Sequence, residues 1–177
     1  MKKIALFLHH PKCSVQSGNG IMTALSSHYS FKIFTRHEVE RDFFDDVDCV
    51  AVPGGIGDAS SFDYLFSENG DSVKQFVRGG GNYLGICMGA YWAEHYYFDL
   101  LKDIRVEQYI TRPGADTCRP HAKNQQVIWQ GQEENMFFYD GCALIGAGID
   151  TAKIWSLYPN GDPMALIQGN VGIMGCH

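Results

Sequence analysis

Cys87 is the residue with the most evident chemical use, because it stands in the pattern Gly-x-Cys-x-Gly over residues 85–89. The apolar run 82–86 predicts a strand before it, and residues 88–101 predict a helix directly after it. A nucleophile on such a sharp strand-to-helix turn, a nucleophile elbow, takes a strained backbone conformation and needs glycines as close neighbours. The N-terminus of the helix would favour the reactive thiolate. The pattern therefore predicts a reactive cysteine; a buried, inert thiol beside packing glycines is the alternative.

A second group of backbone amides is expected on the same side of the fold. Pro53, Gly54 and Gly55 end the apolar run 48–52, which predicts another buried strand. Sites of open α/β sheets lie at the carboxyl ends of their strands. The amides of Gly54 and Gly55, together with the amide of Met88, are therefore predicted to form an oxyanion hole.

Strand and helix patterns alternate in the first part of the chain and predict the fold class. Strands are expected at 3–9, 31–34, 48–52 and 82–86, and helices at 18–29 and over 58–78, where Asn69-Gly70 breaks the pattern. This alternation predicts an α/β fold with a doubly wound, mostly parallel sheet. After Ile104, short strand patterns separated by turn signals predict a β-rich C-terminal half, at 106–110, 126–129, 136–139, 142–146, 153–158, 164–168 and 171–174. No repeat or linker is evident, so a single domain over 1–177 is expected.

The composition argues against several classes of partner. A net charge of −6 without a cluster of Lys and Arg argues against binding to nucleic acid. Because no apolar stretch approaches the roughly 20 residues of a membrane span and no signal peptide is evident, a cytoplasmic protein without a membrane partner is expected. The six cysteines lack the spacing of a disulfide framework and are interpreted as free thiols. Cys118 and His121 have no second pair with ligand spacing, so neither a metal nor a cofactor is expected.

Two segments, 50–55 and 79–91, resemble class I glutamine amidotransferase domains. Within that superfamily the chain is most similar to the amidotransferase-like domain at the N-terminus of eukaryotic-type biotin protein ligases and to its stand-alone bacterial relatives. That group shows a strand ending in Pro-Gly-Gly and the elbow Gly-Ile-Cys-x-Gly-Ala-Tyr. Residues 112–114, 138–141 and 169–177 resemble further segments of the group. The resemblance covers nearly the whole chain and implies a flavodoxin-like fold of the class I amidotransferase type.

The resemblance implies that His177 is the base that takes the proton from Cys87. In amidotransferases a Glu two residues beyond this His orients it, and this sequence has no residue there. Either the chain is cut at this point or the triad is reduced to a Cys–His dyad, in which the terminal carboxylate could partly replace the Glu.

Four further residues are expected to bind substrate. Asp58 resembles an Asp in the group's Pro-Gly-Gly-x-Asp segment, with a helix cap as the alternative. Tyr91 would face the site from the helix that follows the elbow, with packing under the elbow as the alternative. Tyr139 and Asp140 would border the pocket from the β-rich half.

Two functions follow from these features. In the first, a Cys–His dyad hydrolyses a small amide or ester or transfers a group from it, with a synthase or ligase as a protein partner. In the second, the chain is a catalytically silent ligand-binding or regulatory domain. Ala90 and Tyr91 stand where glutaminases have His-Gln, which weakens the resemblance at the place where glutamine would be held. Met88 stands where the related protease and deglycase branch often has His, which argues against that branch.

Overall fold

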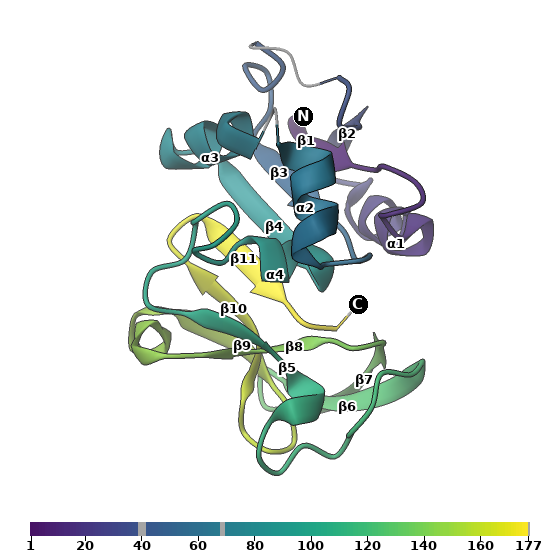
Figure 1. Ribbon diagram of the computed structural model, residues 1–177, viewed down its shortest axis with the longest axis vertical. Coiled ribbons are helices and arrows are strands. Elements are labelled where there is room, and N and C mark those ends of the chain that lie inside the picture. The colour runs from purple at the N-terminus through teal and green to yellow at the C-terminus, as the bar shows by residue number, and fades with distance from the viewer. Residues whose placement is uncertain (39–41, 68–69, 177) are drawn as a thin grey trace.

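Five parallel strands form the first half of the central sheet in the computed structural model, which describes residues 1–38, 42–67 and 70–176 (Figure 1). They are β1 (Lys2–Phe7), β2 (Tyr29–Phe34), β3 (Cys49–Val52), β4 (Asn82–Ile86) and β11 (Val171–Met174). β4 and β11 have the bounds that the sequence predicts. The last strand of the chain thus pairs with the strand that leads into Cys87.

The second half of the sheet is antiparallel and comes from the β-rich C-terminal half. Its strands are β6 (Lys123–Trp129), β7 (Gln132–Phe138), β9 (Lys153–Leu157) and β10 (Pro163–Gln168). The whole sheet has nine strands in the order β2-β1-β3-β4-β11-β10-β9-β6-β7. The expected doubly wound α/β fold with a β-rich C-terminal half is confirmed, and the complete sheet is mixed.

A small second sheet lies beside the antiparallel part (Figure 1). It pairs β5 (Arg105–Gln108) with β8 (Cys142–Ile145). Two short 3-10 helices follow these strands, at Tyr109–Thr111 and Ala147–Thr151. The segment between β7 and β8 carries Asp140 and Gly141, and Gly141 lies against the Gly175 carbonyl directly after β11, the strand that pairs with β4.

Helices cover both faces of the parallel strands. Successive side chains of a strand point to opposite faces, so Ile4 and Leu6 of β1 join the cluster around Ile21, whereas Ala5 and Phe7 join the main core on the other face. The helices are α1 (Val15–Leu25) on the first face, and α2 (Ala59–Phe66), α3 (Gly70–Arg78) and α4 (Met88–Trp92) on the second. Within the described residues, no helix is both long enough and apolar enough to cross a membrane.

The helix expected over 18–29 is wrong at both ends. α1 begins earlier because the Ser14 hydroxyl caps it by accepting from the Ser17 amide at 3.2 Å, and it ends at Leu25, before β2 begins at Tyr29. The two helices expected over 58–78 are present as α2 and α3; Asn69, where the break was placed, lies outside the described residues.

The helix expected over 88–101 is wrong in length, since α4 ends at Trp92. The Phe98 amide donates back to the Trp92 carbonyl at 2.9 Å, and the chain turns at Asp99, whose φ is 53°. Phe98 is buried against Phe62 and Phe66 of α2. Packing of this aromatic side chain in the core therefore replaces continuation of the helix.

Candidate active site

Cys87 lies at the point where β4 ends and α4 begins, in a segment that we call the Cys87 turn (residues 85–89). Its backbone has φ 48° and ψ −99°, which lies outside the regions that an L-residue ordinarily occupies. Such a conformation costs about 1–3 kcal/mol and persists only where the surroundings enforce it. The Cys87 amide donates to the Met174 carbonyl of β11 at 2.8 Å, which fixes the turn to the neighbouring strand.

Two glycines allow the Cys87 turn to pack tightly, as the sequence predicts. A Cβ atom at Gly85 would collide with the carbonyl oxygen of Gly89, and a Cβ atom at Gly89 would collide with the carbonyl oxygen of Val52. The buried Tyr83 hydroxyl donates to the Gly89 carbonyl at 2.7 Å. Any side chain at either glycine would therefore separate the turn from β3 and β4.

Two of the three amides expected in the oxyanion hole, those of Met88 and Gly55, act on the Cys87 thiol and lower its pKa. The amide of Gly54 instead donates to Ser17 Oγ at 3.0 Å, so the expectation that Gly54 contributes a free donor is wrong. Ser17 lies on the buried face of α1, one turn before Ile21. Because a buried hydroxyl needs a hydrogen-bond partner, a serine at this position of the sequence indicates that some buried group pairs with it.

Backbone pairing holds Gly55 in this position. The Ser14 amide donates to the Gly54 carbonyl at 2.7 Å, and the Ile56 amide donates to the Lys12 carbonyl at 2.9 Å. Gly55 itself forms an isolated bridge with Cys13. Because a Cβ atom at Gly55 would collide with the Lys12 carbonyl, only glycine fits this position.

The Cys87 thiol is protonated at neutral pH. Burial raises its pKa to about 11, and the Asp140 carboxylate also raises it, while the amides of Met88 and Gly55 oppose the rise. The first amide of the following helix, that of Met88, favours the thiolate as expected, but burial outweighs its effect. A five-residue helix supplies little dipole, and the side chain, only 6% exposed, loses the hydration that a thiolate needs.

Tyr91 and Asp140 interact electrostatically with Cys87, and their predicted contact with substrate stays a prediction. Burial and the Asp140 carboxylate raise the pKa of Cys87; burial raises the pKa of Tyr91 most, and Asp140 and Cys87 add to this rise. The Tyr91 hydroxyl oxygen and Asp140 Oδ1 are buried without a hydrogen-bond partner among the described residues. Asp140 Oδ2 accepts from Gln108 Nε2 at 2.8 Å, a partner for which the sequence offers no signal.

The other predicted site residues are placed less centrally. Tyr139 is exposed and stays a predicted substrate contact. Asp58 is the N-cap of α2, where its carboxylate accepts from the Ser61 amide at 2.7 Å and from the Ser60 hydroxyl at 2.9 Å. Its carboxylate therefore fills the capping role that was the alternative. His177 lies outside the described residues, so its role as the base stays a prediction.

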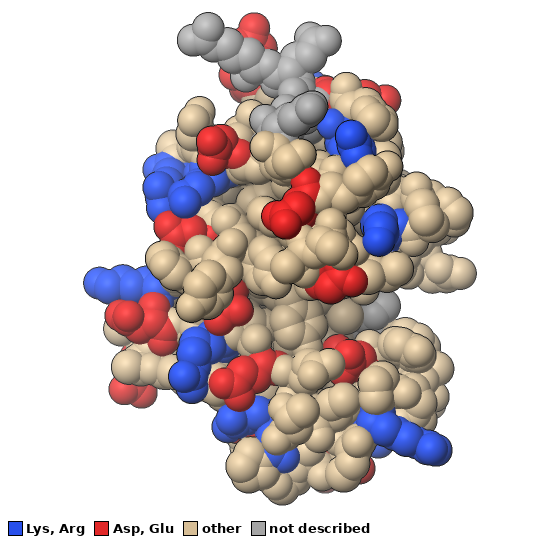
Figure 2. Space-filling model, viewed as in Figure 1, with Lys and Arg blue, Asp and Glu red and all other residues tan. Residues whose placement is uncertain are grey.

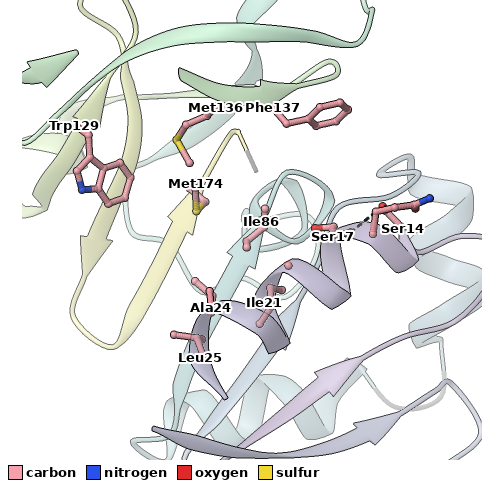
Figure 3. A pocket seen from close by; sticks show the side chains of 13 residues that line it. Ser14, Ser17, Ile21, Ala24, Leu25, Ile86, Trp129, Met136, Phe137 and Met174 are labelled. Atoms are coloured by element: carbon pink, nitrogen blue, oxygen red, sulfur yellow. Dashed lines mark hydrogen bonds between the residues drawn. The ribbon is translucent and has the colours of Figure 1, made fainter. Parts of the chain in front are cut away.

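An apolar groove of about 880 Å³ opens on the α1 face of the sheet (Figure 3). In Figure 3, side chains of α1 lie opposite side chains of the β6–β7 hairpin, with Ile86 and Met174 between them. The lining residues carry no charge; those labelled are Ser14, Ser17, Ile21, Ala24, Leu25, Ile86, Trp129, Met136, Phe137 and Met174. Ser17 lines the groove and also accepts from the Gly54 amide, next to Gly55. The residues that line the groove include no acid or base that could take part in chemistry at Cys87.

Comparisons with known proteins agree with this fold. The family model described as biotin-protein ligase, N terminal, matches residues 11–107. A crystal structure of a glutamine amidotransferase superposes with a TM-score of 0.67 at 16% identity, over 98% of this chain and 89% of that one. A glutamine amidotransferase from Thermotoga maritima gives 0.68 at 12% identity, over 99% and 75% of the two chains. No curated protein matches by sequence. At these identities the structural matches show a shared fold.

A pair of glycine substitutions tests the packing of the Cys87 turn. Gly89→Ala should destabilise the protein by about 2–3 kcal/mol, because the new Cβ atom would displace the turn from the Val52 carbonyl. Gly20→Ala is the matched control within α1, where no atom lies within 4 Å of the added Cβ. It should stabilise by about 0.5–1 kcal/mol through helix propensity. Urea denaturation measures both, and equal stability of the two variants would show that the turn is loosely packed.

The raised pKa of Cys87 predicts a particular pH dependence of alkylation. A thiol whose pKa is about 11 keeps its proton at pH 7, so the rate with iodoacetamide should still rise about tenfold per pH unit from pH 7 to pH 10. Peptide mapping by mass spectrometry measures this rate, with exposed Cys118 as the internal control and circular dichroism as the check on folding. A plateau below pH 8.5 would mean that the surroundings stabilise the thiolate after all.

Proposed function

The chain belongs to the biotin-protein ligase N-terminal family, and we propose that it is a cysteine-dependent hydrolase or amidotransferase that acts on a small amide or ester. The supporting observation is that Cys87 lies on a strained turn at the end of a parallel strand, where the Gly55 and Met88 amides both act to lower the pKa of its thiol. Donors in this position stabilise the oxyanion that forms when a nucleophile attacks a carbonyl carbon. A merely packed cysteine would need neither the strain nor the two directed amides.

In the proposed reaction, Cys87 Sγ bonds to the substrate carbonyl carbon, whose oxygen becomes the oxyanion held by Gly55 and Met88. The scissile C–N or C–O bond then breaks, and the thiol proton passes to the leaving amine or alcohol through His177. Water hydrolyses the resulting thioester, or an acceptor takes the acyl group. Since burial keeps the thiol protonated, the proton leaves Cys87 as the sulfur attacks, which requires a general base rather than a preformed thiolate.

We further propose that ammonia or an amine released at Cys87 would serve a synthase or ligase partner, if the substrate is an amide. The structural neighbours named as glutamine amidotransferases support this class of reaction through fold alone. Glutamine itself is not assigned as the substrate, because Ala90 and Tyr91 stand where glutaminases have His-Gln.

A second candidate function is a silent binding domain, which the electrostatics of the thiol favour. Burial and the Asp140 carboxylate both hold the proton on Cys87. A domain that had lost turnover would have no need to offset these effects. The two functions differ in whether Cys87 reacts with an electrophile that resembles a substrate.

Covalent labelling distinguishes them. Electrophilic glutamine analogues should add one equivalent to the protein at Cys87, as measured by intact mass and peptide mapping, and Cys87→Ser should show no adduct. His177→Gln should slow the labelling by about 10²–10⁴-fold, because it removes the general base. Absence of any Cys87 adduct, with the protein folded, would favour the silent domain.

A further inference from the structure

The first turn of α1 holds both polar backbone groups of Gly54. The Gly54 amide donates to Ser17 Oγ at 3.0 Å, and the Gly54 carbonyl accepts from the Ser14 amide at 2.7 Å. Ser14 is the N-cap of α1 and Ser17 lies one turn further, as Figure 3 shows. The N–H and the C=O of Gly54 therefore both point toward α1.

Gly55 turns its own polar groups the other way. It is paired with Cys13 in an isolated antiparallel bridge. The hydrogen bonds of this bridge are made by the residues that flank the pair, so Gly55 and Cys13 do not bond to each other. In such a pair the two opposed residues direct their N–H and C=O groups away from each other. The Gly55 N–H therefore points away from Cys13.

The strand order shows what lies on that other side. β3 lies between β1 and β4, so Cys13, which follows β1, and the Cys87 turn, which follows β4, flank the segment after β3 on opposite sides. The Pro53 carbonyl accepts from the Gly89 amide at 3.3 Å, and a Cβ atom at Gly55 would lie 2.7 Å from the Met88 sulfur. The Gly55 N–H is therefore directed toward the Cys87 turn.

One side chain contributes to this arrangement of backbone groups. The hydrogen bonds of Pro53 and Ile56 join backbone to backbone, which almost any sequence can supply, whereas the bond from the Gly54 N–H depends on the Ser17 hydroxyl. Ser17 is buried, and Ser14 Oγ fixes its backbone by accepting from its amide at 3.2 Å. Without the hydroxyl, the Gly54 N–H would be buried without an acceptor, a cost that rotation of the peptide would relieve. Such a rotation would also move the Gly55 N–H.

From this geometry, we propose that Ser17 is a positioning residue of the oxyanion hole. Its hydroxyl holds Gly54 so that the Gly55 N–H stays directed at the carbonyl oxygen of a substrate that Cys87 attacks. A donor held in place before the reaction stabilises the oxyanion without the cost of reorganisation. Ser17 acts through the backbone and does not touch the substrate. This inference rests on the proposed function, because the oxyanion belongs to the same reaction.

The test compares two reactions of Cys87, of which one passes through an oxyanion. With p-nitrophenyl acetate, the sulfur bonds to the carbonyl carbon, and p-nitrophenolate leaves from the tetrahedral oxyanion. With iodoacetamide, the sulfur displaces iodide from a CH₂ group and no oxyanion forms. Both reagents are uncharged, because Figure 2 shows acidic side chains on the border of the recess between the two halves of the molecule, which would repel an anion. Since both reactions use the thiolate of Cys87, the ratio of their rates cancels any change in the thiol pKa.

Ser17→Ala should lower the ratio of acetylation to alkylation at Cys87 by about tenfold or more, because the Gly55 amide loses its orientation. Ser17→Val should do the same, whereas Ser17→Thr, which has the shape of valine and keeps the hydroxyl, should stay within about threefold of the unmodified chain. Thr23→Ala removes an exposed hydroxyl from the same helix and should leave the ratio unchanged. Peptide mapping by mass spectrometry assigns each rate to Cys87, and urea denaturation verifies that each variant is folded.

A ratio that stays within about threefold in both Ser17→Ala and Ser17→Val would overturn the inference. So would an equal fall in Ser17→Thr and Ser17→Val, because that result describes disturbed packing rather than the loss of a hydroxyl.

Failure of p-nitrophenyl acetate to acetylate Cys87 in the unmodified chain, while iodoacetamide still alkylates it, would contradict the proposed function instead. The position of Gly55 is then measured without chemistry, by the nuclear Overhauser effect between the Gly55 amide proton and the β protons of Cys87. The positioning role stands if this signal is present in the unmodified chain and in Ser17→Thr and is lost in Ser17→Ala. Any other pattern overturns it.

Discussion

The close approach of the Cys87 turn to β3 is the constraint on which the rest of the site depends. Gly89 lies against the Val52 carbonyl and Gly85 against Gly89, so the turn has no space to relax. Cys87 is consequently held in a conformation that an L-residue avoids. β11 adds a further restraint, because its Met174 carbonyl accepts a hydrogen bond from the Cys87 amide. Three strands that are distant in sequence thus fix the direction of one sulfur atom.

The same packing determines the electrostatics of the thiol. Bringing the sulfur under the Gly55 and Met88 amides also removes it from water, and the loss of hydration outweighs the two amides. Asp140 adds to this effect from the β-rich half. Under the proposed function, the two amides would therefore stabilise an oxyanion at the substrate carbonyl rather than a resting thiolate, and a general base would have to take the proton of Cys87.

Local patterns in the sequence predict the parts of this arrangement that depend on local structure. The strands β4 and β11 are recognisable as apolar runs, and the glycines of the Cys87 turn are recognisable from their spacing. The length of α4 was not predictable, because Phe98 leaves the helix to pack against α2. Gly54 was assigned wrongly for a similar reason, since its partner Ser17 comes from a distant helix. The raised pKa of Cys87 likewise arises from tertiary burial, which no spacing of residues reveals.

A crystal structure of Cys87 after reaction with a small aldehyde or ketone inhibitor would test the central claim most directly. The carbonyl oxygen of the adduct should lie about 2.7–3.1 Å from the backbone nitrogens of both Gly55 and Met88, with the Gly54 amide still bonded to Ser17. An adduct oxygen that points away from these two amides, or that takes the Gly54 amide from Ser17, would contradict it.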